Sequence, residues 1–186
     1  MRILPPPLTQ LKAQYGNYGY GVSENTAMVV TGNTFKVIGT SGVYVFDVSV
    51  AVQGSRNTND KGRYGLKNVK MAYLTPGDSY DMTTRKITYA TNKVKLFGAN
   101  QVKTKAITTN DIFGPSIFST ITDSLFASNA STSTFGYTNY TNPQYIVNFR
   151  KLIGGWSMFA TSPTNSSLQY ISFQTCYMDL YCYANC

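Results

Sequence analysis

Apolar and polar side chains alternate along much of this chain, as they do in strands that bury one face. The clearest case is 43–52, where the even positions are all apolar and the odd positions include Asp47, Ser49 and Ala51. We therefore expect its even side chains in the core. The other predicted strands are 28–30 and 34–38, joined by a turn at Thr31-Gly32-Asn33, then 66–74, 85–97, 144–153 and 168–183, with a turn at 75–78.

Two later segments add detail. In the last strand, we expect Ile171, Phe173, Tyr177 and Tyr181 to share a face. After Gly114-Pro115, an apolar residue recurs every fourth position, which predicts a helix of about three turns; its stripe is Ile117, Ile121 and Leu125, with Phe118 alongside. Segment 127–143 is rich in Ser, Thr, Asn and Tyr, and we expect a loop there.

The spacing of short strands and turns predicts an all-β fold, an antiparallel β-sandwich of jelly-roll-like type with one short helix. At 186 residues the chain fits one such domain, which we place at 22–186. The scarcity of helix-forming surface residues agrees, since Glu occurs once, at Glu24.

Residues 1–21 are predicted to form an extended N-terminal arm. Three consecutive prolines favour polyproline II, and the stretch from Tyr15 to Gly21 alternates tyrosine with glycine. We expect this arm to pack on the domain or, preferably, on a neighbouring copy. The residues assigned to that contact are Pro5, Pro6, Pro7, Tyr15, Tyr18 and Tyr20.

Positive charge is concentrated in the middle of the sequence. The net charge is +8, and residues 56–105 hold eleven of the sixteen Lys and Arg side chains. A hairpin with a loop at 98–100 places four lysines on one side: Lys93, Lys95, Lys103 and Lys105. Like charges directly opposite destabilise a strand pair, so this side is either a solvated edge that lysines protect, a contact for nucleic-acid phosphates, or a contact for an acidic protein partner.

Catalytic chemistry is not predicted. The chain has no histidine, which removes the common nucleophile and metal-site arrangements, and its few acids do not cluster. Asp78 and Asp81 suit turn capping. Phosphate-binding loop motifs are also absent, and we expect no cofactor and no small-molecule substrate.

The three cysteines, Cys176, Cys182 and Cys186, lie at the C-terminal end and do not complete a tetrahedral metal site. Within one strand Cys176 and Cys182 would be about 20 Å apart, too far for a disulfide. We expect buried free thiols, with a crosslink to another subunit through Cys186 as the alternative.

In overall style the chain resembles small virion subunits with jelly-roll or related sandwich folds. The shared features are a Pro-rich arm, one-faced strands such as 43–52, the Asn/Thr-rich loop 127–143 and a final strand that completes the sheet. The resemblance implies a structural protein of a virus or bacteriophage, as capsid, minor capsid or cement subunit, made in the host cytoplasm and located in the virion. Its implied partners are other copies of itself and other virion proteins. Many genome-facing coats concentrate their basic residues in the arm, whereas this chain concentrates them in the middle, which leaves a decorating role open. Nucleic acid remains a candidate partner of 56–105.

A second hypothesis is a carbohydrate- or surface-binding sandwich of the adhesin or fibre-tip type. Its candidate stacking residues are Tyr145, Trp156 and Tyr170, for which core or interface packing is the ordinary alternative. No apolar stretch approaches the length of a membrane helix or a secretory signal, so we expect no membrane contact.

Overall fold

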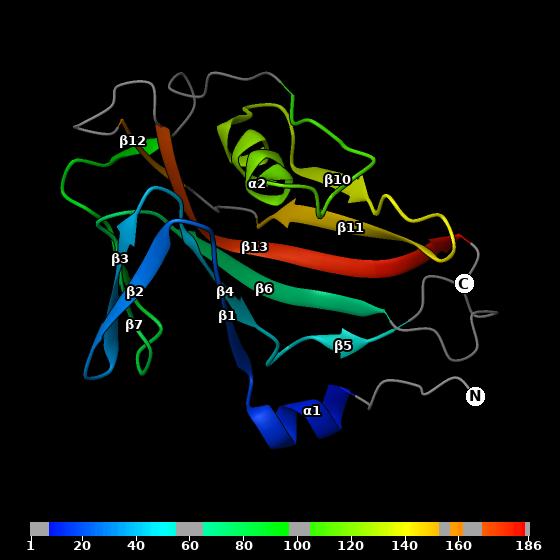
Figure 1. Ribbon diagram of the computed structural model, residues 1–186, viewed down its shortest axis with the longest axis horizontal. Helices are drawn as coiled ribbons and strands as arrows, with labels where there is room; N and C mark the ends of the chain where they lie inside the picture. Colours follow the sequence, from blue (N-terminus) through cyan, green and yellow to red (C-terminus); the bar gives the residue numbers. More distant parts are fainter. Residues whose placement is uncertain (1–7, 55–64, 97–104, 153–156, 162–168, 185–186) are drawn as a thin grey trace.

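The computed structural model describes residues 8–54, 65–96, 105–152, 157–161 and 169–184 (Figure 1). Two helices are present, α1 (Leu8–Tyr15) and α2 (Ile117–Ala127). The strands are β1 (Tyr18–Val22), β2 (Thr26–Thr31), β3 (Thr34–Gly39), β4 (Val43–Asp47), β5 (Val52–Gln53), β6 (Leu66–Leu74), β7 (Ser79–Asp81), β8 (Ile87–Thr88), β9 (Val94–Leu96), β10 (Ser133–Tyr137), β11 (Gln144–Lys151), β12 (Ser157–Thr161) and β13 (Gln169–Ala184).

The strands form two antiparallel sheets that pack against each other, which confirms the all-β sandwich with a short helix. Among the described residues the large sheet has nine strands, six of them in the order β1-β4-β6-β13-β11-β10. Strand β5 pairs with β6, β12 pairs with the first residues of β13, and β9 pairs with β12. The small sheet has the order β2-β3-β7-β8. A jelly roll divides eight strands between two sheets, whereas these sheets have nine and four described strands. The feature that the fold shares with jelly rolls is therefore the β-sandwich architecture.

Strand β4 is covered on both faces, and this explains why consecutive residues in it are buried. Val43 and Val45 pack with Phe35 and Val37 of the small sheet. Tyr44 points the other way, into the core beneath α2. The small sheet and α2 therefore cover opposite faces of the large sheet, as Figure 1 shows.

Helix α2 forms where the spacing of its apolar residues predicts it. Ile121 and Leu125 are fully buried against the large sheet. Phe126, at the end of the helix, stacks on Phe173 of β13 with ring centroids 4.1 Å apart. The β2–β3 hairpin and β6 are likewise confirmed, with Gly32 at a φ of 58° in the hairpin turn. A positive φ there suits the two-residue turns that join antiparallel strands.

The prediction of a long one-faced strand at 43–52 is wrong beyond Asp47. The Asp47 carboxylate accepts a hydrogen bond from the Ser49 amide at 2.8 Å, which turns the chain out of the sheet. Val50 and Val52 are consequently 55% and 51% exposed rather than buried.

The extended N-terminal arm is also wrong for the described part of 1–21. Residues 8–15 form α1, whose Leu8 is buried with Ala51 and Val69. Residues 18–22 form β1, which pairs with β4 from Tyr18 opposite Asp47 to Val22 opposite Val43. Alternate side chains of a strand point to the same face, so the tyrosines of β1 share one face and its glycines the other. On the tyrosine side, Tyr20 packs against Phe35 of the small sheet. Pro5, Pro6 and Pro7 lie outside the described residues.

A bulge in β13 overturns the predicted common face of its aromatic residues. Thr175 has a φ of 63°, and the pairing with β6 shifts between Phe173 and Cys176. The side-chain alternation is therefore reset. Ile171 and Phe173 face the core with Cys176, whereas Tyr177 and Tyr181 lie on the opposite face.

Three further segments differ from expectation. The 127–143 region contains β10, and the predicted strand at 85–97 is present only as β8 and β9. Strand β12, which pairs with both β13 and β9, was not predicted. Among the described residues, neither helix has the length and apolarity needed to cross a membrane.

Candidate binding surfaces

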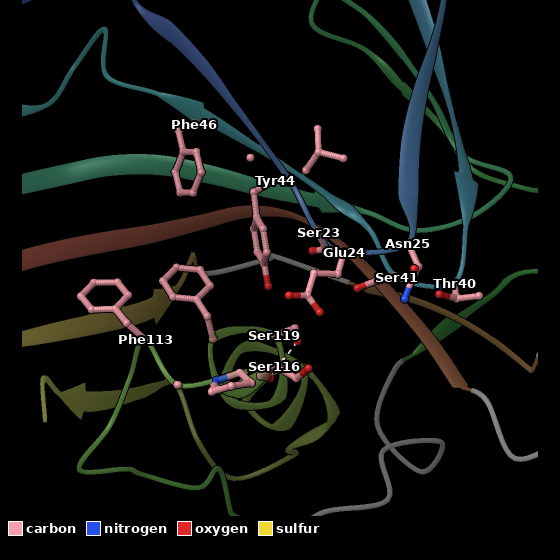
Figure 2. A pocket seen from close by; sticks show the side chains of 15 residues that line it. Ser23, Glu24, Asn25, Thr40, Ser41, Tyr44, Phe46, Phe113, Ser116 and Ser119 are labelled. Atoms are coloured by element: carbon pink, nitrogen blue, oxygen red, sulfur yellow. Dashed lines mark hydrogen bonds between the residues drawn. The ribbon is translucent and has the colours of Figure 1, made fainter.

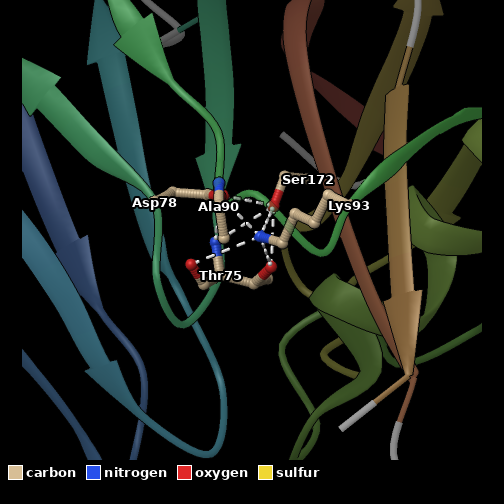
Figure 3. A network of polar contacts seen from close by, with 5 residues as sticks. All are labelled: Thr75, Asp78, Ala90, Lys93 and Ser172. Carbon is tan, nitrogen blue, oxygen red and sulfur yellow. Dashed lines mark hydrogen bonds and ion pairs between the residues drawn. The ribbon is translucent and has the colours of Figure 1, made fainter. Parts of the chain in front are cut away.

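Lys93, predicted to lie on an exposed basic face, is buried in the interior. Its ammonium lies 2.7 Å from the Asp78 carboxylate, and neither side chain is exposed to solvent. Figure 3 shows the two side chains meeting between the small sheet on one side and β13 on the other. The assignment of Lys93 to an anion or partner contact is therefore corrected, because its anion is a carboxylate of the same domain.

Asp78 is the centre of this buried network. Its carboxylate accepts hydrogen bonds from the Thr75 and Ala90 amides, both at 3.0 Å, and from the Ser172 hydroxyl at 2.6 Å. Lys93 donates to the hydroxyls of Thr75 and Ser172 at 2.7 and 2.8 Å. Burial lowers the pKa of Lys93, while Asp78 opposes that shift. The network links the end of β6, the turn before β7, the β8–β9 connection and β13, and its burial indicates a structural role.

The other three lysines do not form a common face in the described structure. Lys95 is exposed on β9, opposite Met158 of β12. Lys105 is exposed and lies outside any strand. Lys103 and the predicted loop lie outside the described residues.

The cysteines differ from one another in state. Cys176 is a free thiol with no exposed surface, and burial raises its pKa to about 12. Cys182 is disulfide-bonded, so the expectation of a free thiol is wrong there. Cys186 lies outside the described residues, so the proposed link to another subunit stays a prediction.

The aromatic residues assigned to a sugar platform are not brought together. Tyr170 pairs with Ala160 near the start of β13, and Tyr145 pairs with Cys182 near its end. They lie about 40 Å apart along the strand. Trp156 lies outside the described residues.

A groove of about 670 Å³ lies between the β1–β2 turn and the start of α2 (Figure 2). Its apolar wall contains Tyr44, Phe46 and Phe113. Hydroxyl groups also line the groove, and in Figure 2 Ser23 and Ser41 lie on one flank while Ser116 and Ser119 lie on the other. Sequence reasoning missed this groove because its walls come from segments that are distant along the chain.

Glu24 supplies the only carboxylate among the described residues that line the groove. The Tyr44 hydroxyl lies 3.3 Å from the Thr122 hydroxyl, and burial raises the Tyr44 pKa well above its usual value. A single carboxylate beside rings and hydroxyls can bind a polar ligand, but it provides no acid and base pair for hydrolysis.

The outer edge of β2 is a second candidate surface. Strand β2 ends the order of the small sheet, and no described strand pairs with that edge (Figure 1). Its sequence, TAMVVT, contains no charged residue. Val29 and Val30 are 47% and 55% exposed, and Ile38, which pairs with Ala27 from β3, is 46% exposed.

Other sheet edges are short, covered or weakened. Strand β8 has two residues and directly follows Arg85 and Lys86. The outer edge of β10 is covered by 107–112, which bonds to Tyr137 through Thr109 and Ile112. Strand β1 contains two glycines, which weaken a strand. Among these described edges, β2 offers the longest run of strand-forming residues.

No protein-family model matches this chain, and no solved structure matches it. Its function is therefore inferred from the chemistry and geometry of these surfaces.

Proposed function

We propose that this protein is a structural subunit of a larger assembly, of the capsid, minor capsid or cement kind found in viruses and bacteriophages. The observation that supports this proposal is the uncharged, apolar outer edge of β2. Natural proteins usually protect such an edge with charges, proline, a bulge or a covering segment, because it can pair with another chain. An unprotected edge beside exposed valines suits a subunit that uses the edge for association.

The partner at this edge is a second copy of the chain. Two copies of β2 can pair antiparallel about a two-fold axis, which joins identical surfaces. Self-pairing places no like charges opposite each other, because β2 carries none. The exposed Val29 side chains would be buried in the contact, which adds apolar stabilisation to the backbone hydrogen bonds.

The substitution Val29→Lys tests this role. Its side chain is half-exposed in the single chain, so lysine should leave the fold intact while placing like charges across the symmetric contact. Sedimentation velocity should show defined oligomers for the unaltered protein and a monomer for the variant. The matched control is Val94→Lys, which adds the same charge at a 59% exposed valine of β9.

A monomeric unaltered protein at all accessible concentrations would contradict the assembly role. Oligomers that survive Val29→Lys but dissociate in Val94→Lys would keep the role and move the contact to β9. Thermal melting of both variants checks that the domain remains folded.

The groove beside α2 favours carbohydrate binding as a second candidate function. Sugars bind where aromatic faces meet hydroxyl and carboxylate partners, and this groove combines Phe46 and the 64% exposed Phe113 with Glu24. Glycan binding to a monomeric protein, lost in Glu24→Gln, would support this function over assembly. Absence of binding across a broad glycan array would remove it.

A further inference from the structure

The large sheet has a tyrosine-rich area on the face opposite α2. We call this area the tyrosine face, and it contains Lys67, Lys70, Tyr137, Tyr177, Tyr181 and Tyr183. These residues come from β6, β10 and β13, so neither the basic middle of the sequence nor its C-terminal strand forms the area alone. The pairing of β13 with β6 brings the two together.

Strand register explains why these side chains share a face. Tyr177 pairs with Lys70 of β6 on one side and with Arg150 of β11 on the other. Residues that pair directly lie on the same face, so all three point away from α2. Tyr181 lies four residues further along β13 and therefore on that face too. The bulge at Thr175 is what turns these tyrosines away from the core.

No described element packs over this part of the sheet. The core beneath α2 is formed by the alternate residues of the same strands, including Met71, Val147 and Phe149. Leu8 of α1 packs with Val69, which shares the inward face of Met71. The small sheet covers the far end, where Val45 and Leu74 lie.

The tyrosine face is hollowed where its rings are densest. A depression of about 410 Å³ is lined by Tyr137, Tyr181 and Tyr183, together with Lys67 and Asn148. The rings of Tyr137 and Tyr183 meet edge to face at 4.8 Å, and Tyr183 is 49% exposed. The Lys67 ammonium lies 5.5 Å from the Tyr181 ring centre. Ring faces and a cation are therefore presented side by side.

Cations exceed carboxylates across this face. Lys70 is exposed, and Arg150 has 43% of its side chain exposed beside the Tyr177 ring. The carboxylate within the face, Asp179, forms an ion pair with Arg150 at 3.0 Å and accepts a hydrogen bond from the backbone N–H of Asn68 at 2.8 Å. At the margin, Asp47 faces Lys70, and Arg85 stacks on the Tyr18 ring at 3.6 Å. Together, Lys67, Lys70 and Arg150 outnumber Asp47 and Asp179, and at the margin Arg85 is offset by its neighbour Asp81.

We propose that the tyrosine face binds single-stranded nucleic acid. Every base has a flat face that can stack on an aromatic ring, and the lysines of the tyrosine face can contact the phosphates between bases. Along β13 this face extends about 26 Å from Thr175 to Tyr183. That length accommodates roughly four nucleotides, at the lower end of known single-strand sites. The excess of cations favours this polyanion over a neutral glycan. The site does not depend on the assembly contact at β2, which lies on the other sheet.

Fluorescence anisotropy with a labelled twelve-nucleotide deoxythymidine strand tests the proposal. Tyr183→Ala, an exposed position, should weaken binding by about fivefold to a hundredfold, the range for loss of one stacked base. The double change Lys67→Gln and Lys70→Gln should weaken binding and reduce the slope of log K against log salt by about 0.7 for each phosphate that is no longer neutralised. The charge-matched control is the double change Lys36→Gln and Lys95→Gln, at exposed lysines of β3 and β9, and it should change neither quantity.

Three results would overturn the site. The first is no measurable binding by the unaltered protein at low salt. The second is equal weakening by the double change Lys36→Gln and Lys95→Gln, which would show attraction to net charge alone. The third is unchanged affinity in Tyr183→Ala. Glycan binding that Tyr183→Ala abolishes, without oligonucleotide binding, would assign the face to carbohydrate instead.

Discussion

Replacing Lys93 with methionine should destabilise the domain strongly, although the two side chains have similar length. The substitution leaves the Asp78 carboxylate buried without its ion-pair partner, and removing one member of a buried pair costs about 3–5 kcal/mol. Asp78 retains the Thr75 and Ala90 amides and the Ser172 hydroxyl. We therefore expect a loss near the lower limit, about 3 kcal/mol. For a chain of this size that corresponds to a decrease in Tm of roughly 6–12 °C.

Thermal and urea unfolding followed by circular dichroism measure this loss. Lys95→Met, at an exposed lysine of the adjoining strand β9, should change stability by less than about 0.5 kcal/mol. The double change Lys93→Met and Asp78→Asn removes the residual charge, so its cost should be smaller than the sum of the single changes by about 1 kcal/mol or more. A decrease in Tm of Lys93→Met no larger than that of Lys95→Met would refute the buried ion pair.

Two other predictions concern ionisation and reactivity. Burial raises the pKa of Tyr73 and of Tyr80 to about 12, so the folded state keeps protons that the unfolded state loses near pH 10. Stability present below pH 10 should therefore decline between pH 10 and 12, by about 3 kcal/mol for Tyr73. Urea midpoints measured from pH 9 to 12 with tyrosinate absorbance check this, and a midpoint that is constant across that range would contradict it. The Cys176 thiol, buried with a pKa of about 12, should resist a thiol reagent at pH 8 in the native protein and react after unfolding in urea; rapid native labelling at Cys176 would show that the site opens.

The spacing of apolar residues predicted α2 and the β2–β3 hairpin, because both form from residues that are close together in sequence. The four-residue spacing of Ile117, Ile121 and Leu125 sufficed for α2, and a short turn between two apolar runs sufficed for the β2–β3 hairpin. The limits of β4 were missed because the Asp47 side chain ends the strand with a hydrogen bond that alternation does not reveal. The N-terminal segment was missed because β1 is stabilised by pairing with β4, and not by its own glycine-rich sequence.

The candidate surfaces were less predictable because they depend on contacts between distant segments. Lys93 looks like a surface residue until Asp78 and Ser172 are placed beside it. The tyrosine face requires the bulge at Thr175, and a β-branched residue is among the least expected at a positive φ. The positive charge is concentrated in sequence, but the fold separates its described members: Lys93 is in the interior, Lys67, Lys70 and Lys95 are on the large sheet, and Arg85 and Lys86 are between β7 and β8 of the small sheet.

Hydrogen exchange of residues 26–31 at a series of protein concentrations tests the assembly claim most directly. If copies associate through β2, backbone amides on its outer edge become hydrogen-bonded in the assembly, and their protection should rise with concentration. Amides of β6, in the middle of the large sheet, should show no such dependence. Exchange within 26–31 that is rapid and independent of concentration, in a sample that sediments as oligomers, would contradict association at this edge.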